Sequence, residues 1–159
     1  MVWKPNVTVA AVIERNGKFL LIEEDSEGAI VLNQPAGHWD EGESLLEAVA
    51  RETLEESAWH FSPEALVGIY HWSHTQKGVT YLRFAFTGRV QKHESQRPLD
   101  NGIRQTLWLT LDEIRAQAHR HRSPQVQRCI DDYLAGQRFP LSLIKDMGVY
   151  DLTRDGEPE

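Results

Sequence analysis

The chain has 159 residues and a mass of 18.2 kDa, the length of one globular domain. Hydrophobic residues make up 40% and charged residues 26% of the chain, so its composition excludes a disordered, collagen-like or coiled-coil protein. The formal net charge is −7. Because binding to nucleic acids or anionic membranes depends on basic surfaces, this charge favours neither partner.

We expect a single domain over residues 1–151, followed by a frayed polar tail at 152–159. The one cysteine, Cys129, cannot form an internal disulfide, and nothing else indicates an oxidising compartment. The apolar run at 7–13 is too short to span a bilayer and lacks a signal-peptide cleavage pattern. The sequence therefore predicts a cytoplasmic protein.

Near the start of the chain, two strands are predicted over residues 7–14 and 18–23. Asn16 and Gly17 lie between them, and both residues tolerate the positive φ angles of a type I′ hairpin turn. A short third strand is predicted over 30–32.

The rest of the chain alternates between strand and helix patterns. A loop containing Pro and Gly is expected over 33–37, and from Ser44 the hydrophobic period becomes helical, with Ser44 as the N-cap of a helix to about residue 57. Further strands are predicted over 65–72, 80–90 and 105–108, and further helices over 110–118 and 124–136. Few helices among strands with short connections indicate an α+β sandwich with a mixed sheet.

Three glutamates gather on one face of the helix that begins at Ser44. Each helical residue advances by about 100°, so Glu52, Glu55 and Glu56 share one sector while the apolar residues occupy another. Like charges at this spacing repel, and a hard cation such as Mg²⁺, which prefers carboxylate oxygens, would offset the repulsion. The glutamates alone leave open a second interpretation, a solvated helix face.

The residues around these glutamates resemble the Nudix box, G-x5-E-x7-R-E-U-x-E-E-x-G-U, where U is a bulky aliphatic residue. Residues 37–59 read GHWDEGESLLEAVARETLEESAW. The matching positions are Gly37, Glu43, Arg51, Glu52, Glu55 and Glu56. Two positions depart, with Thr53 at the first U and Ala58 at the last glycine. Ala58 either adopts the left-handed conformation, at about 1–2 kcal/mol, or lets the helix continue.

The resemblance to Nudix hydrolases implies an α+β fold, the Nudix-type α/β/α sandwich with a mixed sheet and a catalytic loop and helix. It implies that Glu55 and Glu56 are metal ligands, and that Glu52 joins the metal site or orients the attacking water. Gly37 would offer its backbone carbonyl to a metal. The expected cofactor is Mg²⁺, with Mn²⁺ as a possible substitute.

Other residues have weaker claims to a role. Arg51, about 40° from Glu55 around the helix, would hold a catalytic carboxylate in place, and Glu43 would brace the junction of loop and helix. Outside the box, the candidates for a further acid, a base or a substrate contact are Asp100, His71, His74, Trp3, Trp39, Tyr70, Trp72, Lys4, Arg83 and Arg104. For each of these, a packing, turn or surface role is the alternative. The basic run at 119–122 is expected to be a solvated loop.

The runs at 4–10, 33–38 and 136–141 also resemble one branch of the family. That branch contains bacterial phosphatases that release inorganic phosphate from hydroxymethylpyrimidine pyrophosphate, thiamine pyrophosphate and nucleoside di- and triphosphates. The resemblance implies a monomeric, Mg²⁺-dependent phosphatase of small diphosphates. Two alternatives remain open: a pyrophosphohydrolase of nucleotide sugars, dinucleotides or capped RNA, and a Nudix-fold module that binds a ligand without turnover.

Overall fold

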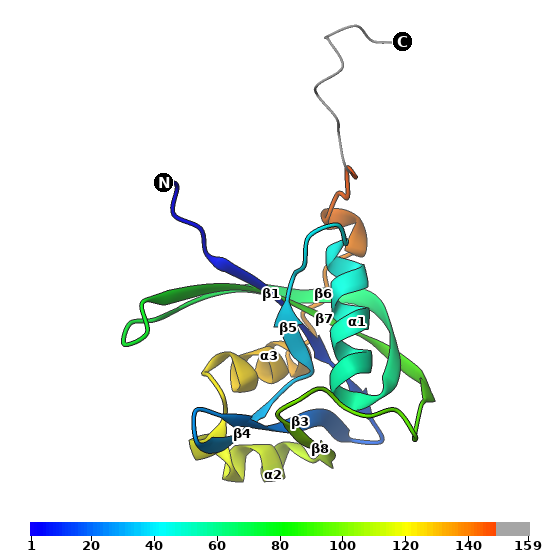
Figure 1. The fold of residues 1–159 in the computed structure, drawn as a ribbon. Helices are drawn as coiled ribbons and strands as arrows, with labels where there is room; N and C mark the ends of the chain where they lie inside the picture. Colours follow the sequence, from blue (N-terminus) through cyan, green and yellow to red (C-terminus); the bar gives the residue numbers. More distant parts are fainter. Residues whose placement is uncertain (149–159) are drawn as a thin grey trace, which may run out of the picture.

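Two four-stranded β-sheets with helices around them form the fold of the computed structural model (Figure 1). The structure describes residues 1–148, so the predicted tail at 152–159 and the domain boundary at 151 lie outside the described residues. The first sheet has the order β5 (Ala36–His38), β1 (Asn6–Val12), β7 (Val79–His93) and β6 (Trp59–His74). It is mixed, because β1 and β7 are parallel and the other pairs are antiparallel.

The second sheet is antiparallel and centres on β3. Its strands are β2 (Glu14–Arg15), β3 (Lys18–Ser26), β4 (Ala29–Asn33) and β8 (Ile103–Leu109), of which β8 pairs with β3. The helices are α1 (Leu45–Ser57), α2 (Leu111–Ala116) and α3 (Gln125–Leu134), with 3-10 turns η1 (Ala118–Arg120) and η2 (Leu141–Leu143). None of the helices in the described part of the chain is long and apolar enough to cross a membrane.

Strand β1 is buried on both faces and divides the core into two layers. Val9 and Ala11 belong to the hydrophobic cluster that includes α1, whereas Ala10 and Val12 belong to the cluster that includes α2 and α3. Alternate residues of a strand point to opposite faces, and Figure 1 shows α1 and α3 on opposite sides of the mixed sheet. The predicted α/β/α arrangement is therefore confirmed, and burial on both faces explains why residues 9–12 of β1 are all apolar.

The turn at Asn16 and Gly17 forms as predicted, but the strand before it is not continuous. The φ angles of these residues are 54° and 75°, and the turn joins β2 to β3. The strand predicted over 7–14 breaks at Ile13, where the chain passes from the mixed sheet to the antiparallel sheet. Ile13 is 1% exposed. The apolar pattern therefore continues through the change of sheet, and the sequence gives no sign of the break.

Several predicted boundaries were wrong. The expected loop at 33–37 contains the start of β5, which pairs with β1. Strand β6 begins at Trp59 and not at residue 65, because bulges in its pairing with β7 accommodate Pro63. Helices α2 and α3 occur where expected, but they are shorter than predicted.

Both ends of α1 are capped. At its start, the Ser44 hydroxyl accepts a hydrogen bond of 3.1 Å from the Glu47 N–H. At its end, Ala58 adopts the left-handed conformation, with φ 62° and ψ 14°, and its N–H donates to Leu54 O. Of the two geometries considered for Ala58, the structure has the left-handed one. The chain then enters β6 at once with Trp59.

Candidate active site

A pocket of about 430 Å³ opens beside β5 and α1, near the turn of the hairpin formed by β6 and β7. Gly37, Glu52 and Glu56 of the box line it. Its other walls come from strands and loops distant in sequence, among them Glu24, Trp72, Tyr81, Arg83, Arg122 and Gln125. The pocket therefore joins the acidic helix face to aromatic and cationic side chains.

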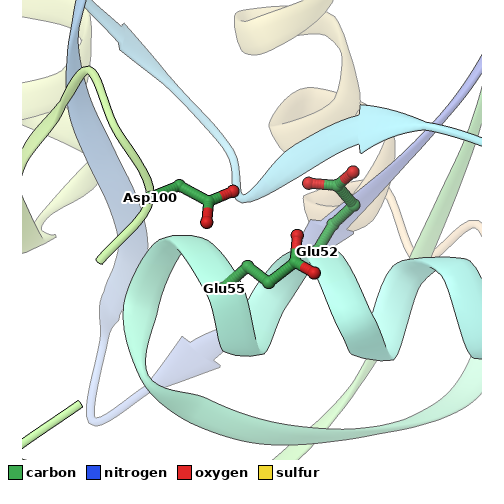
Figure 2. A group of neighbouring side chains, drawn as sticks. All are labelled: Glu52, Glu55 and Asp100. Carbon is green, nitrogen blue, oxygen red and sulfur yellow. The ribbon is translucent and has the colours of Figure 1, made fainter. Parts of the chain in front are cut away.

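Three carboxylates converge at one edge of α1. Oxygen atoms of Glu52, Glu55 and Asp100 lie within 4.8 Å of one another, and Figure 2 shows the three side chains directed toward the same region. Asp100 comes from the loop between β7 and β8, and its N–H donates to Glu55 O at 3.0 Å. This bond holds the loop on the helix. Clustered carboxylate oxygens suit a hard divalent cation.

The Glu52 carboxyl packs directly against the backbone of β5. A Cβ atom added to Gly37 would overlap the Glu52 carboxyl, so a larger residue here would displace that carboxyl from its position. The Glu52 side chain is 12% exposed. Burial raises its pKa to about 7, although the nearby Arg51 guanidinium favours the charged form.

Glu56 points to a different part of the pocket. Its Oε1 accepts a hydrogen bond of 2.8 Å from the Ala36 N–H, and the residue is 8% exposed. Burial raises the pKa of Glu56 to about 9, and the charges of Glu24 and Glu52 act in the same direction. Without bound cation, this carboxyl is therefore mostly protonated at neutral pH.

Arg51 ties the loop before α1 to the carboxylates of the helix. Its Nε and Nη2 donate to the two oxygens of Glu43 at 2.9 and 2.7 Å, and its Nη1 donates to Glu52 at 2.9 Å and to Glu55 at 3.2 Å. The paired Glu43 raises the pKa of Arg51, and Arg51 lowers that of Glu43. Arg51 does not line the pocket, so it acts on the site by orienting carboxylates.

Arg83, a candidate for substrate contact, lies in the pocket wall but is 5% exposed. Its Nη1 donates to Gln34 Oε1 at 2.9 Å and its Nη2 to Asn33 Oδ1 at 3.1 Å. These bonds hold the guanidinium between β7 and the end of β4. The geometry favours a role in shaping the wall.

The other candidates separate into two groups. Trp72 and His74 line the pocket, whereas His71 lies along a shallower groove beside α3. Trp39 is 47% exposed, and its indole N–H donates to Glu43 O at 2.7 Å. The pocket does not include Trp39, or the candidates Trp3, Lys4, Tyr70 and Arg104.

Two features of the pocket were missed from the sequence. Tyr81 faces Trp72 across the hairpin, and their rings stack with centroids 5.7 Å apart and planes 13° apart. Arg122 is exposed, as expected for a solvated loop at 119–122, but it also lines the pocket. The alternation of side chains along the two strands would have predicted the Trp72–Tyr81 pair only if the strand register had been known. No local sequence pattern distinguishes Arg122.

Comparisons with known proteins agree with this geometry. Residues 3–129 match the family model of the NUDIX domain. The chain is 40% identical over 144 residues to phosphatase NudJ of Escherichia coli, covering 91% of this chain and 93% of that protein. A NUDIX hydrolase structure from Nitrosomonas europaea is 53% identical with a TM-score of 0.89, covering 90% and 97% of the two chains. The MutT NUDIX hydrolase of Burkholderia pseudomallei shares the fold, with 20% identity, a TM-score of 0.70 and coverage of 82% and 98%.

Proposed function

Because this chain belongs to the Nudix family of hydrolases, which act on phosphoric anhydride bonds, we propose that it is a Mg²⁺-dependent phosphatase of small diphosphates. The observation that carries the proposal is the convergence of Glu52, Glu55 and Asp100 beside a pocket with an aromatic wall. The relative named phosphatase NudJ supports the release of inorganic phosphate.

The residues at the site fit a divalent cation. Three carboxylates from α1 and one loop converge within 4.8 Å, and the absence of a side chain at Gly37 leaves space for the Glu52 carboxyl. Glu52, Glu55 and Asp100 would hold Mg²⁺ or Mn²⁺. Glu56 and the Gly37 carbonyl, which line the adjoining pocket, are proposed as further ligands.

When bound, the cation would neutralise phosphate oxygens and make the attacking water more acidic. Arg51 keeps Glu52 and Glu55 in fixed positions through Nη1. Oε1 of Glu52 accepts a hydrogen bond from Arg51, which leaves Oε2 to bind the cation or, alternatively, to orient the attacking water.

The aromatic wall favours substrates with a planar ring. Trp72 lines the same pocket as Glu52 and Glu56 and is stacked on Tyr81. A ring stacked on such a surface gains about 1–3 kcal/mol. The substrates proposed from the family branch, namely hydroxymethylpyrimidine pyrophosphate, thiamine pyrophosphate and nucleoside di- and triphosphates, all carry a ring of this kind.

The test is release of orthophosphate from thiamine pyrophosphate with Mg²⁺ and without added pyrophosphatase. We expect release that EDTA abolishes and that Glu55→Gln lowers at least a hundredfold. Glu47→Gln, an exposed position on the first turn of the same helix, is the control and should retain full activity. Metal-independent release would contradict the proposal.

The product also distinguishes the alternatives. Phosphate that appears from nucleotide sugars only after a phosphomonoesterase is added would favour the pyrophosphohydrolase. Tight ligand binding without Mg²⁺-dependent turnover would favour the binding module. Trp72→Ala should raise KM for thiamine pyrophosphate about fivefold or more, whereas Trp3→Ala, at a site 69% exposed outside the pocket, should not.

We further propose a cytoplasmic monomer whose partner is the small-molecule substrate and not a nucleic acid. The net charge of −7 supports this proposal, because a nucleic acid would be repelled. Size-exclusion chromatography with light scattering tests the monomer, and a mass near 36 kDa, twice the 18.2 kDa of one chain, would contradict it.

A further inference from the structure

Three side chains with positive charge line the pocket: Lys77, Arg83 and Arg122. The buried guanidinium of Arg83 is held by two neighbouring amide side chains. Lys77 Nζ lies 2.8 Å from Glu27 Oε1, an ion pair between the connection of β6 to β7 and the connection of β3 to β4. Arg83 Nε has no hydrogen-bond partner within residues 1–148, but it is buried, and Lys77 already has an ion-pair partner on an exposed turn.

Arg122 differs because most of its donors are unused. Within residues 1–148, Glu24 is the one hydrogen-bond partner of its guanidinium, through Nη1 at 2.5 Å. The Arg122 side chain is 45% exposed, which leaves Nε and Nη2 available in the pocket. A guanidinium presents its donors as a planar fork that matches two oxygens of a phosphate group.

The fold fixes Arg122 in this position through two contacts. Its backbone N–H donates to Leu32 O at 2.8 Å and so ties the segment before α3 to β4. The partner carboxylate, Glu24, lies on β3 and is 8% exposed. Because a buried carboxylate already holds Nη1, the guanidinium loses little freedom when a ligand binds.

A neighbouring pair has the same construction but lies outside the pocket. Glu23 Oε2 and Arg120 Nη1 are 2.8 Å apart. Successive residues of a strand point to opposite faces, so Glu24 faces the pocket while Glu23 and Arg120 do not line it. The chain therefore contains a matched control for the pair of Glu24 and Arg122.

We propose that Arg122 binds the substrate, donating from Nε and Nη2 to a phosphate group of the diphosphate, and that Glu24 is a positioning residue that orients it. The inference rests on the proposed function, since it assigns a phosphate contact within the same pocket. Glu52 and Glu56 line that pocket with carboxyl groups, which cannot attract a phosphate. Arg122 supplies the positive charge that these residues lack.

The test measures binding of methylenediphosphonate, a diphosphate analogue that cannot be hydrolysed, by calorimetry with Mg²⁺. Arg122→Gln should raise Kd at least tenfold, whereas Arg120→Gln should change it less than twofold. Arg122→Lys, which keeps the charge but loses the planar fork, should give an intermediate loss. Glu24→Gln should raise Kd severalfold alone but add little to Arg122→Gln, because it acts through Arg122.

The outcomes separate this inference from the proposed function. A folded Arg122→Gln variant with unchanged affinity, or equal losses in the Arg122 and Arg120 variants, overturns the inference, and so does wild-type protein that does not bind the analogue. If thermal unfolding shows that Arg122→Gln is not folded, Arg122→Lys decides in the same way. Wild-type protein that binds the analogue through Arg122 but hydrolyses no diphosphate would overturn the proposed function and leave this inference standing.

Discussion

Replacing Glu56 by glutamine should make the free energy of unfolding of the metal-free protein depend less on pH. The buried Glu56 carboxyl has a pKa of about 9 in the folded protein, against 4.5 for the exposed group. A raised folded pKa means that the native state binds the proton more tightly than the unfolded state. The stabilisation is therefore complete below pH 4.5 and is lost as pH rises toward 9.

The size of the effect follows from the same values. Each pKa unit corresponds to about 1.4 kcal/mol, so ionisation of Glu56 in the unfolded chain lowers the free energy of unfolding by about 3 kcal/mol between pH 5 and 7. Glutamine does not ionise, and its side-chain oxygen can still accept from the Ala36 N–H. Glu52, with a pKa of about 7, contributes a loss of the same sign that remains in the variant.

The assay is urea unfolding of both proteins in EDTA at pH 5 and pH 7. Between these values, Glu56→Gln should gain about 3 kcal/mol relative to wild type, whereas the exposed control Glu47→Gln should follow the wild type. Mg²⁺ should stabilise the wild type more at pH 7 than at pH 5, because it binds the ionised carboxylates. Parallel pH profiles for wild type and Glu56→Gln would refute the assignment of a buried, protonated carboxyl.

Three further predictions concern the same helix and its surroundings. Arg51→Lys should lower kcat at least tenfold in steady-state kinetics at saturating Mg²⁺, because an ammonium group cannot hold Glu43 and both helix carboxylates together; an unchanged kcat would exclude the positioning role. Asp100→Asn should raise the Mg²⁺ concentration for half-maximal activity severalfold, and an unaltered metal titration would remove this residue from the metal site. Ala58→Gly should relieve the left-handed backbone and stabilise the fold by about 1 kcal/mol, raising Tm by about 2–4 °C; a lower Tm would mean that the lost methyl packing outweighs the strain.

The acidic face of α1 could be predicted from the sequence because it depends on helical spacing alone. Residues three and four positions apart share a face in any α-helix, and Ser44 marks where that helix begins. The family could likewise be predicted from the resemblance to the Nudix box, and the α+β fold class from the strand and helix patterns along the chain. The left-handed conformation of Ala58 was one of two alternatives, since a single residue type does not decide how a helix ends.

The residues on the opposite side of the pocket could not be predicted in this way. Trp72 and Tyr81 meet through a strand register that three bulges shift, and a shift of one residue moves a side chain to the other face. Arg122 reaches the pocket only because its backbone is tied to β4 and its side chain to Glu24 on β3.

The sequence by itself determined the family, the α+β architecture and the carboxylates of α1, because short-range spacing and hydrophobic periodicity encode these features. The tertiary structure decided which residues face those carboxylates across the pocket. Asp100 and Arg122 come from loops, and Trp72 from a long hairpin, so their positions depend on pairings between segments far apart in the chain. No local pattern records such pairings.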